Sequence, residues 1–242
     1  IPTQSNAVEF TKENAWTNNA AETNEGEVKS ESDLTFTQEN TNVRTIAHTI
    51  KLSVQILSDA PALRAYVNRR MVHGVNQRLD TQLVAGDGTS PNLDGMLNTG
   101  NFTAFAPTAS ETAIDGLNRA KEALELADYA ATGILMNPAD WYAIERLKTA
   151  DLTYLVGDPF GQIIPRLWGL PIVTSKAITA GSFLMADFEI AYEHYSRSGI
   201  AVEFGYVNDD FARNLITMRA ERRDALATLN AVAARSGLLV AA

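Results

Sequence analysis

The sequence predicts a protein of the α+β class, built around one long helix. Three observations support this fold class. Hydrophobic residues recur at every fourth position between Asp59 and Gly86, hydrophobic and polar residues alternate just before this stretch, and short helical patterns alternate with short apolar runs after it. The first pattern has the helical period, the second has the strand period of two, and the third is typical of packed helices and strands.

The long helix is predicted from Asp59 to Gly86. Its hydrophobic stripe consists of Leu63, Val67, Met71, Val75, Leu79 and Leu83. Asp59 can cap the first turn, Pro61 suits the first position, and Gly86 can take the left-handed conformation that closes a helix. A four-residue repeat advances by about 400° per step, so the stripe drifts by about 40° each time. The two ends of the helix are therefore expected to meet different partners, which are separate lobes or separate subunits.

A β-hairpin is predicted at the N-terminal end. Hydrophobic and polar residues alternate from Val8 to Trp16 and again from Asp33 onward. Between the two runs, residues 17–32 hold few apolar side chains among Asn, Thr, Glu and Ser, so this stretch cannot pack a core of its own. Two interpretations stay open, a disordered surface loop and a protruding arm.

A half-buried strand is predicted before the long helix, over residues 45–56. The side chains that share its hydrophobic face are Ile46, His48, Ile50, Leu52, Val54 and Ile56. After the helix, the stretch from Gly86 to Asn92 is dense in turn-forming residues and predicts a tight loop. A phosphate-binding loop is disfavoured, because the Walker spacing and its lysine are absent.

The second half of the chain predicts an α/β lobe. One helix is expected over 112–129, with an ion pair between Lys121 and Glu125, and another begins with Asn137 as its cap and Pro138 in its first position. The other elements expected here are apolar strands at 134–136, 170–174 and 183–186, a loop over 151–165 and a helical turn over 188–195.

The C-terminal stretch is partly ambiguous. A strand is expected over 202–206 and a turn over 208–210. From 211 to 229 the hydrophobic spacing permits both a helix and a strand, and periodicity does not choose between them.

Composition excludes several kinds of chemistry. With no cysteine, disulfides and thiolate metal sites are excluded. The formal net charge of −9 argues against a surface that grips phosphate backbones, although a wall that only faces nucleic acid can be acidic. Since no apolar run reaches membrane-spanning length and no secretory leader is visible, we expect a soluble protein without a signal peptide. Because the first residue is Ile1, we expect proteolytic processing or a trimmed chain.

No conventional active site emerges from the residue types. The three histidines lack partners at metal-ligand spacing, so neither a metal nor a cofactor is predicted. Nucleophile-elbow and dinucleotide-binding glycine patterns are absent. Glu189 and Glu193 lie one helical turn apart and suit the paired carboxylates of a hydrolase, but two glutamates on a solvated helix face are the commoner case. Trp16, Trp141 and Trp168 are interpreted as packing residues.

Several stretches follow one another in an order known from one protein family. They are residues 45–48 leading into 59–61, 86–89 with 92–95, 136–141, 168–173 and 214–223. This series resembles the major capsid proteins of tailed bacteriophages, the family named for the phage Hong Kong ninety-seven. Each stretch is weak alone, but together they run through nearly the whole chain in the family's order.

The resemblance implies the phage major capsid fold and a division of the chain into parts. Residues 1–6 become the remnant of an N-terminal arm, 7–44 an extended β-hairpin arm that lies over a neighbouring subunit, and 45–88 a peripheral domain with a spine helix. Residues 89–196 become an axial α/β domain, 197–223 peripheral strands and 224–242 a return to the axial domain. The resemblance also favours a strand over 211–223, and it implies a scaffolding segment removed by a phage protease.

The resemblance further implies a covalent cross-link between subunits. In the namesake capsid, a lysine of the arm forms an isopeptide bond with an asparagine of another subunit, assisted by a glutamate. The matching residues here are Lys29, Asn214 and Glu221, with Glu221 as the assisting base. An amine with a pKa near 10.4 must lose a proton to attack, so it needs apolar surroundings and a nearby carboxylate. On a regular strand, residues seven apart face opposite sides, so the site is expected to combine several subunits. The alternative is that Lys29 is solvated, Asn214 is a ladder residue and Glu221 pairs with the neighbouring arginine 222 or 223.

The implied function is structural and not enzymatic. Copies of the chain are expected to assemble as pentamers and hexamers into an icosahedral virion shell for double-stranded DNA, built in the cytoplasm of a bacterial host. Portal and decoration proteins are the other expected partners, and no membrane is involved. An encapsulin-like nanocompartment subunit, which encloses enzymes, is the nearest alternative. The long polar arm and the cross-link residues favour the virus.

Overall fold

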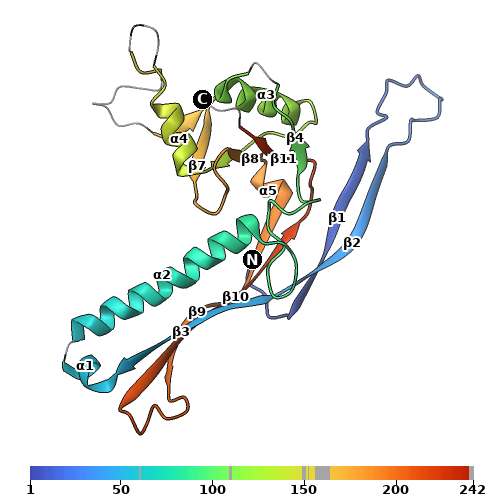
Figure 1. Ribbon diagram of the computed structural model, residues 1–242. Coiled ribbons are helices and arrows are strands. Elements are labelled where there is room, and N and C mark those ends of the chain that lie inside the picture. The colour runs from blue at the N-terminus through green and yellow to red at the C-terminus, as the bar shows by residue number, and fades with distance from the viewer. Residues whose placement is uncertain (60, 109–110, 149–150, 152, 156–163, 240–242) are drawn as a thin grey trace.

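The described residues form three separate sheets, one long helix and four shorter helices (Figure 1). The computed structural model describes residues 1–59, 61–108, 111–148, 151, 153–155 and 164–239. The helices are α1 Val54–Asp59, α2 Pro61–Ala85, α3 Ala113–Glu125, α4 Pro138–Glu145 and α5 Phe188–Ala191. The strands are β1 Ala7–Thr17, β2 Asp33–Asn42, β3 Arg44–Ser53, β4 Thr103–Phe105, β5 Gly133–Met136, β6 Arg166–Leu167, β7 Leu170–Thr174, β8 Ser182–Ala186, β9 Tyr192–Gly205, β10 Leu215–Thr228 and β11 Ala234–Leu238. None of the described helices is long and apolar enough to cross a membrane.

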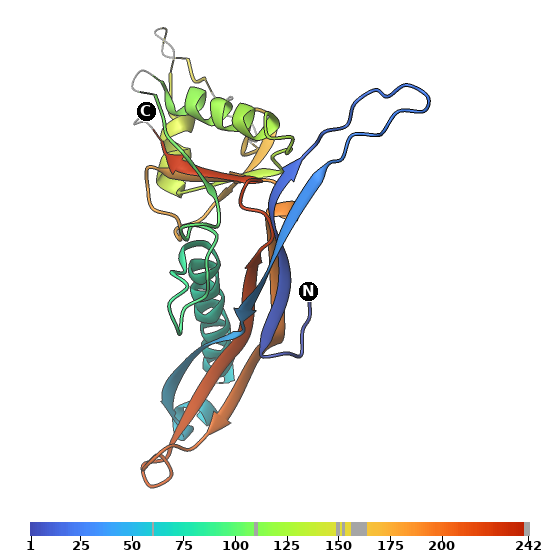
Figure 2. The same ribbon diagram turned by 90° about the vertical axis from the view of Figure 1, so that its right-hand side faces the viewer.

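The predicted N-terminal hairpin is confirmed. Strands β1 and β2 pair antiparallel, from Ala7 opposite Asn42 to Thr17 opposite Asp33. Together with the exposed connection between them, they form a ribbon that we call the arm, residues 7–42. Figure 2 shows the far end of the arm projecting well away from the rest of the molecule, which we call the body. Of the two interpretations of residues 17–32, the structure therefore shows the protruding arm.

The hydrophobic stripe of α2 is confirmed, and its two ends do meet different partners. Toward its N-terminal end, the stripe packs against Met218 and Ala220 of β10. At its C-terminal end, Val84 joins a second cluster with Leu184 of β8. The stripe residues that are buried are Val67, Met71, Val75 and Leu79, with Leu63 and Leu83 packed at the two margins. The helix therefore connects the three-stranded sheet, in the order β3-β10-β9, with the six-stranded sheet.

The strand before α2 is shorter than predicted. Strand β3 ends at Ser53, and Val54 and Ile56 lie in α1 instead of continuing the alternation. The partner strand explains the difference, because Ser53 lies opposite Leu215, where β10 begins. Beyond that point no strand of the described sheet is available for pairing, and the chain turns into a helix.

The predicted closure of α2 by a left-handed Gly86 is wrong. Its backbone is not in the left-handed region, and glycine is needed there for a close approach instead. A Cβ atom at this position would come within 2.5 Å of the carbonyl oxygen of Gln82 and closer still to that of Leu93. The Gly86 N–H donates to the Gln82 carbonyl at 3.0 Å. The predicted cap depends on the Asp59 side chain and on residue 60, and both lie outside the described part of the structure.

The predicted α/β lobe is confirmed around the six-stranded sheet, whose order is β4-β11-β8-β5-β7-β6. Thr112 and Asp115 form a capping box at the start of α3, and Asn137 caps α4 with Pro138 in the first turn. The Lys121–Glu125 ion pair is present at 3.6 Å. Most of the predicted loop over 151–165 lies outside the described residues.

The ambiguous C-terminal stretch is a strand. Strand β10 runs from Leu215 to Thr228 between β3 and β9, and residues 211–214 form a turn before it. The predicted helical turn over 188–195 is correct only for α5, because Tyr192 already begins β9. The end of β10 is buried, and Leu226 belongs to the same cluster as Val84. Strand β10 therefore follows α2 from one sheet to the other.

The close approach at Gly86 gives a stability prediction. We expect Gly86→Ala to lower the free energy of unfolding by about 1–3 kcal/mol, because the added methyl group must displace backbone. Urea unfolding of the purified chain measures the change. Gly199→Ala is the matched control, since a Cβ there meets nothing within 4 Å. We expect this control to leave stability unchanged or to raise it slightly. Equal stability of the two variants would contradict the proposed crowding.

Candidate functional site

The arm is attached to the body only near its base. The Glu13 N–H donates to the Leu229 carbonyl at 3.0 Å, and the Tyr129 hydroxyl donates to the Glu13 carboxylate at 3.5 Å. A register shift interrupts the ribbon between Glu13 and Ala15, which is where the arm leaves the body. Among the described residues, no hydrogen bond joins residues 15–36 to the body. The outer arm is therefore supported only by its own two strands.

Several large apolar side chains of the arm are exposed. Trp16 is 53% exposed and Phe36 is 56% exposed, and Trp16 lies opposite Leu34 in the ribbon. The expectation that all three tryptophans pack inside is therefore wrong for Trp16 and also for Trp168, which is 46% exposed, while Trp141 is buried. An isolated ribbon with exposed aromatic side chains is the kind of surface that another protein surface covers.

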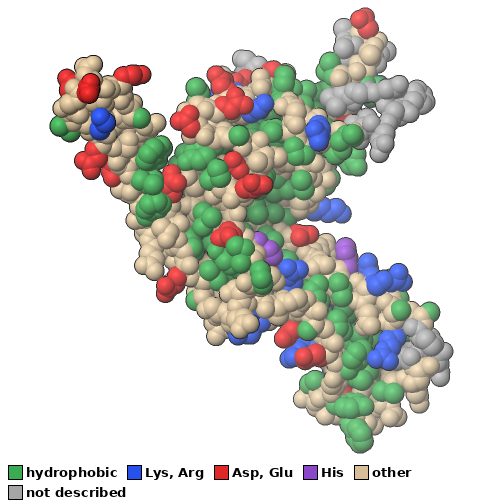
Figure 3. Space-filling model, turned by 180° about the vertical axis from the view of Figure 1, so that it is seen from behind, with side chains coloured by type: hydrophobic (Ala, Val, Ile, Leu, Met, Phe, Trp, Pro, Cys, Tyr) green, Lys and Arg blue, Asp and Glu red, His purple; other side chains and the backbone are tan. Residues whose placement is uncertain are grey.

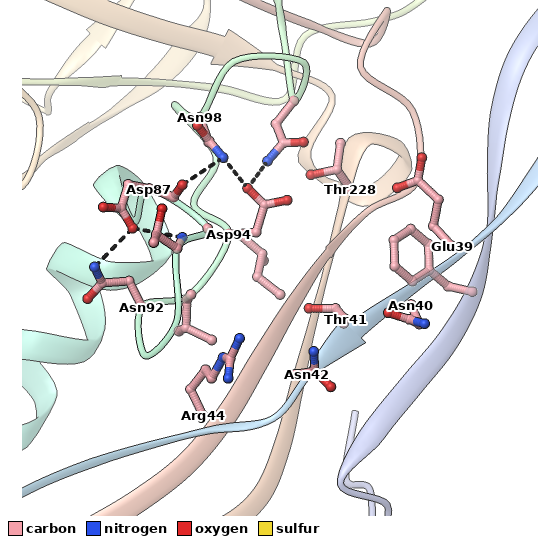
Figure 4. A pocket seen from close by; sticks show the side chains of 16 residues that line it. Glu39, Asn40, Thr41, Asn42, Arg44, Asp87, Asn92, Asp94, Asn98 and Thr228 are labelled. Atoms are coloured by element: carbon pink, nitrogen blue, oxygen red, sulfur yellow. Dashed lines mark hydrogen bonds between the residues drawn. The ribbon is translucent and has the colours of Figure 1, made fainter.

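A polar cleft of about 400 Å³ lies between the arm base and the loop after α2 (Figure 4). Arg44 reaches toward that loop and donates to the Ser90 hydroxyl at 3.2 Å. Asp94 accepts hydrogen bonds from the amides of Asn98 at 2.7 Å and Asn101 at 2.9 Å. The predicted tight loop is confirmed. The side-chain amides of Asn98 and Asn101 already use the hydrogen-bonding capacity of one oxygen, Oδ1, of the Asp94 carboxylate.

Asp87 illustrates how this loop is held. Its carboxylate accepts from the Asn92 amide and from the Thr89 N–H, each at 2.9 Å, and these bonds hold the pKa of Asp87 below its usual value. In the described part of the chain, no group of three or more His, Asp or Glu side chains is placed to share a metal ion. The hydrogen bonds to Asp87 and Asp94 tie the wall of the cleft together as a structural joint beside the arm.

The structure places the three predicted cross-link residues far from one another. Lys29 is exposed near the tip of the arm. Asn214 is exposed in the turn between β9 and β10, with a left-handed φ of 54°, and is not on the strand as predicted. Glu221 is half-buried in β10, seven residues further on. Figure 2 shows the arm tip and the β9–β10 turn at opposite ends of the molecule, so one chain does not bring the three residues together.

The partner predicted for Glu221 in the alternative interpretation is also wrong. Its carboxylate lies 3.3 Å from Arg219 on the same face of β10, while Arg222 pairs with Asp224 at 2.7 Å. The reason is the strand period of two, which brings residues i and i+2 to one side.

A buried carboxylate that the sequence did not single out fixes the turn that carries Asn214. Asp210 accepts hydrogen bonds from Lys51 of β3 at 2.8 Å, Thr217 of β10 at 2.6 Å and the Val207 N–H at 2.9 Å. The Lys51 ammonium, helped by Thr217 and Val207, lowers the pKa of Asp210 to about 2. Its partners come from strands far apart in the sequence, so no local pattern marks it.

The remaining titratable candidates have structural partners. The paired-carboxylate hypothesis fails, because α5 ends before Glu193, which accepts a hydrogen bond from the Tyr195 hydroxyl. His194 lies 2.9 Å from Asp224. Burial alone would raise the pKa of Asp224, but hydrogen bonds from His194 and Arg222 hold it below its usual value. These contacts tie β9 to β10 and leave no free acid–base pair there.

Comparisons with known proteins support the fold. Residues 1–236 match the model of the phage capsid family. The major capsid protein of Enterobacteria phage HK97 is 37% identical over 228 residues, which is 93% of this chain and 59% of that protein, so the chain spans about three fifths of this relative. A solved chain from Mycobacterium phage Bobi has a TM-score of 0.72 at 15% identity, covering 98% of this chain and 87% of its own. The capsid of the native GTA particle, computed with C5 symmetry, has a TM-score of 0.73 at 15% identity, covering 100% and 87%.

The bonds to Asp210 give a pH prediction. A carboxyl with a pKa of about 2 when folded and about 4 when unfolded stabilises the fold above about pH 4, and this contribution is lost as the pH falls toward 2. We expect Asp210→Asn to unfold at lower urea concentration near neutral pH, and the difference from the wild type to shrink as the pH falls. Urea unfolding at several pH values measures this. Asp209→Asn is the control, because Asp209 is exposed beside it; an equal effect of both changes would contradict the assignment.

Proposed function

The chain belongs to the phage capsid family, and from this premise we propose that it is the shell subunit of a virion. Copies of it would assemble as pentamers and hexamers into an icosahedral container for double-stranded DNA, in the cytoplasm of a bacterial host, with portal and decoration proteins as further partners. The observation that carries the proposal is the unsupported arm on a capsid fold. Two-stranded ribbons are marginally stable alone, so the arm needs a neighbouring surface.

We also propose that the parts of the chain divide the work of assembly. The three-stranded sheet with α2 would be the peripheral domain, made of residues 45–88 and 197–223. The six-stranded sheet would be the axial domain around the five-fold and six-fold positions, made of residues 89–196 and 224–242. The support for this division is that the two sheets are joined by α2 and β10 and have separate cores.

We further propose that Lys29 of one subunit forms an isopeptide bond with Asn214 of another. The lysine nitrogen would attack the side-chain amide carbon of Asn214, a C–N bond would form, and ammonia would leave with the proton taken from the amine. Glu221 of a third subunit would accept the proton from the lysine amine and pass it to the departing amide nitrogen. A single chain holds the three residues apart, which supports a reaction that waits for assembly.

The surroundings of Asn214 suit this reaction. Asn214 donates its N–H to the Phe211 carbonyl, and the Phe211 ring contacts the Tyr206 ring edge-to-face at 5.9 Å. Both rings are largely exposed in the isolated chain, at 79% and 60%. Such rings would give an incoming lysine the apolar surroundings that favour its neutral form.

The size of the assembled product tests the shell proposal. We expect the purified protein to sediment as a megadalton particle, whereas an enzyme of this length would run as a small oligomer. Analysis of what the particles contain then distinguishes a virion from an encapsulin-like compartment, because a virion encloses DNA and an encapsulin-like compartment encloses enzymes. A chain that stays monomeric, with the arm folded onto its own body, would overturn the proposal.

The cross-link has its own test. We expect mature wild-type particles, boiled in denaturant, to run on a gel as covalent multimers, and Lys29→Arg particles to run as single chains, because a guanidinium does not form the isopeptide. Lys12→Arg is the matched control, since Lys12 is the other lysine of the arm and pairs with Glu39 at 3.8 Å. We expect Glu221→Gln to slow cross-linking by about 10²-fold or more, as for loss of a positioned base. Single chains from mature wild-type particles would refute the cross-link.

A further inference from the structure

A buried hydroxyl group at the end of β10 has no hydrogen-bond partner. Thr228 is the last residue of this strand and is 4% exposed, and its Oγ1 atom is unpaired among the described residues. Buried polar side chains in folded proteins are nearly always hydrogen-bonded, so an unpaired one points to a group that completes it, such as an ion or a water molecule. Thr228 lines the polar cleft beside the arm base. Figure 4 shows its hydroxyl directed into the cleft, toward the Asp94 carboxylate.

Two further oxygen atoms on this side of the cleft are unused. The amides of Asn98 and Asn101 both donate to Oδ1 of Asp94, so Oδ2 accepts no hydrogen bond within the described part of the chain. Asn101 is 5% exposed, and its Nδ2 also donates to the Gly95 carbonyl at 2.9 Å. Its Oδ1 accepts no bond from any described residue. A carboxylate oxygen and an amide oxygen of two bonded side chains are therefore both free.

The backbone holds these groups beside the end of β10. Tyr192 lies opposite Thr228 in the β9–β10 pair, and its hydroxyl donates to the Asn101 carbonyl at 2.9 Å. The loop that carries Asp94 is fixed to α2, because the Met96 N–H donates to the Leu83 carbonyl at 2.8 Å. Oxygen atoms from two segments far apart in the sequence are thus held on one wall without a ligand having to gather them.

The charge of the cleft favours a cation. The charged side chains that line it are Glu39, Asp87, Asp94 and Arg44, three acids and one base with a net charge of −2. Arg44 already donates to the Ser90 hydroxyl. The volume of about 400 Å³ has room for an ion together with several water molecules, each of which takes about 30 Å³.

We propose that the polar cleft binds a calcium ion. Its protein ligands are Oδ2 of Asp94, Oδ1 of Asn101 and the Thr228 hydroxyl, and water molecules complete the shell. Glu39, which Figure 4 shows on the arm side of the cleft, holds one of these waters. The ion would join the loop after α2 to the end of β10 at the arm base. This inference does not depend on the proposed shell function.

The ligand set selects the metal and its affinity. Carboxylate, amide and hydroxyl oxygens suit hard cations, and Ca²⁺ accepts six to eight of them in irregular geometry. Mg²⁺ requires a near-ideal octahedron and gives up its water reluctantly, so it fits this wall less well. Only one carboxylate binds directly, in keeping with the absence of any group of three acidic or histidine ligands in the described part of the chain. A weak site with a Kd of about 10⁻⁴–10⁻³ M is therefore expected.

Calorimetric titration of Ca²⁺ into the purified full chain, after treatment with a chelator, tests the site. We expect one ion per chain with a Kd of about 10⁻⁴–10⁻³ M, and Mg²⁺ to bind at least about 10-fold more weakly. Asp94→Asn should weaken Ca²⁺ binding by at least about 10-fold, because it keeps an acceptor for Asn98 and Asn101 but removes the charged ligand. Glu122→Gln is the matched control, since Glu122 is exposed on α3, and it should leave the Kd unchanged.

Thr228→Val gives a second measurement with two opposite signs. Without Ca²⁺ we expect this variant to unfold at a higher urea concentration than the wild type, because it removes a buried hydroxyl that has no partner. With about 10 mM Ca²⁺ the wild type should gain more stability than the variant, since the ion binds only the folded chain and binds the wild type more tightly. Sodium chloride at the same ionic strength controls for screening.

Three results would overturn the calcium site. The first is the absence of saturable Ca²⁺ binding. The second is equal weakening by Asp94→Asn and Glu122→Gln, which would mean diffuse attraction to an acidic protein. The third is a Thr228→Val variant that is less stable than the wild type in chelator and binds Ca²⁺ unchanged, which would assign a water molecule to the hydroxyl. None of these results bears on the shell function, because the titration does not require assembly.

Discussion

The packing of one helical stripe against two cores is the interaction on which the rest of the structure depends. Val67, Met71 and Val75 of α2 bury against β10 in the three-stranded sheet, and Leu83 of the same stripe packs, beside Val84, against the cluster that contains Leu184 of the six-stranded sheet. Because a four-residue repeat drifts around the helix, one straight element presents apolar side chains to both. Strand β10 spans the same distance beside it. The relative position of the two sheets is therefore set by a helix and a strand that both cross between them, and not by a linker.

A body fixed in this way leaves the arm outside its own hydrophobic cores. The ribbon is tied near Glu13 and then continues without further hydrogen bonds to the described body, carrying exposed Trp16 and Phe36. Its stability has to come from contacts that the single chain does not contain. Incomplete burial therefore indicates that a neighbouring surface covers the arm.

Local signals predicted the local elements well. The stripe of α2, the caps of α3 and α4 and strand β7 were all predicted, because each depends on residues close together in the sequence. The errors occur where a partner far away in the sequence determines the local structure. Val54 and Ile56 continue the strand alternation but lie in a helix, because the partner strand begins opposite Ser53. Asp210 was predicted only as part of a turn, since its ion-pair partner Lys51 is 159 residues away. The cross-link residues were inferred from the resemblance alone. A site that is shared between several copies leaves no recognisable pattern in the sequence of a single chain.

The two sides of the proposed cross-link are held in very different ways. Asn214 lies in a turn that Asp210 fixes through Lys51, Thr217 and the backbone of Val207. Lys29 lies on an outer arm with few contacts, the kind of segment that opens at low cost in free energy. With a fixed electrophile and a loosely held nucleophile, the position of the arm would control the proposed reaction. A neighbouring subunit that orders the arm tip would therefore bring the amine into place only after assembly, which would time the proposed covalent closure.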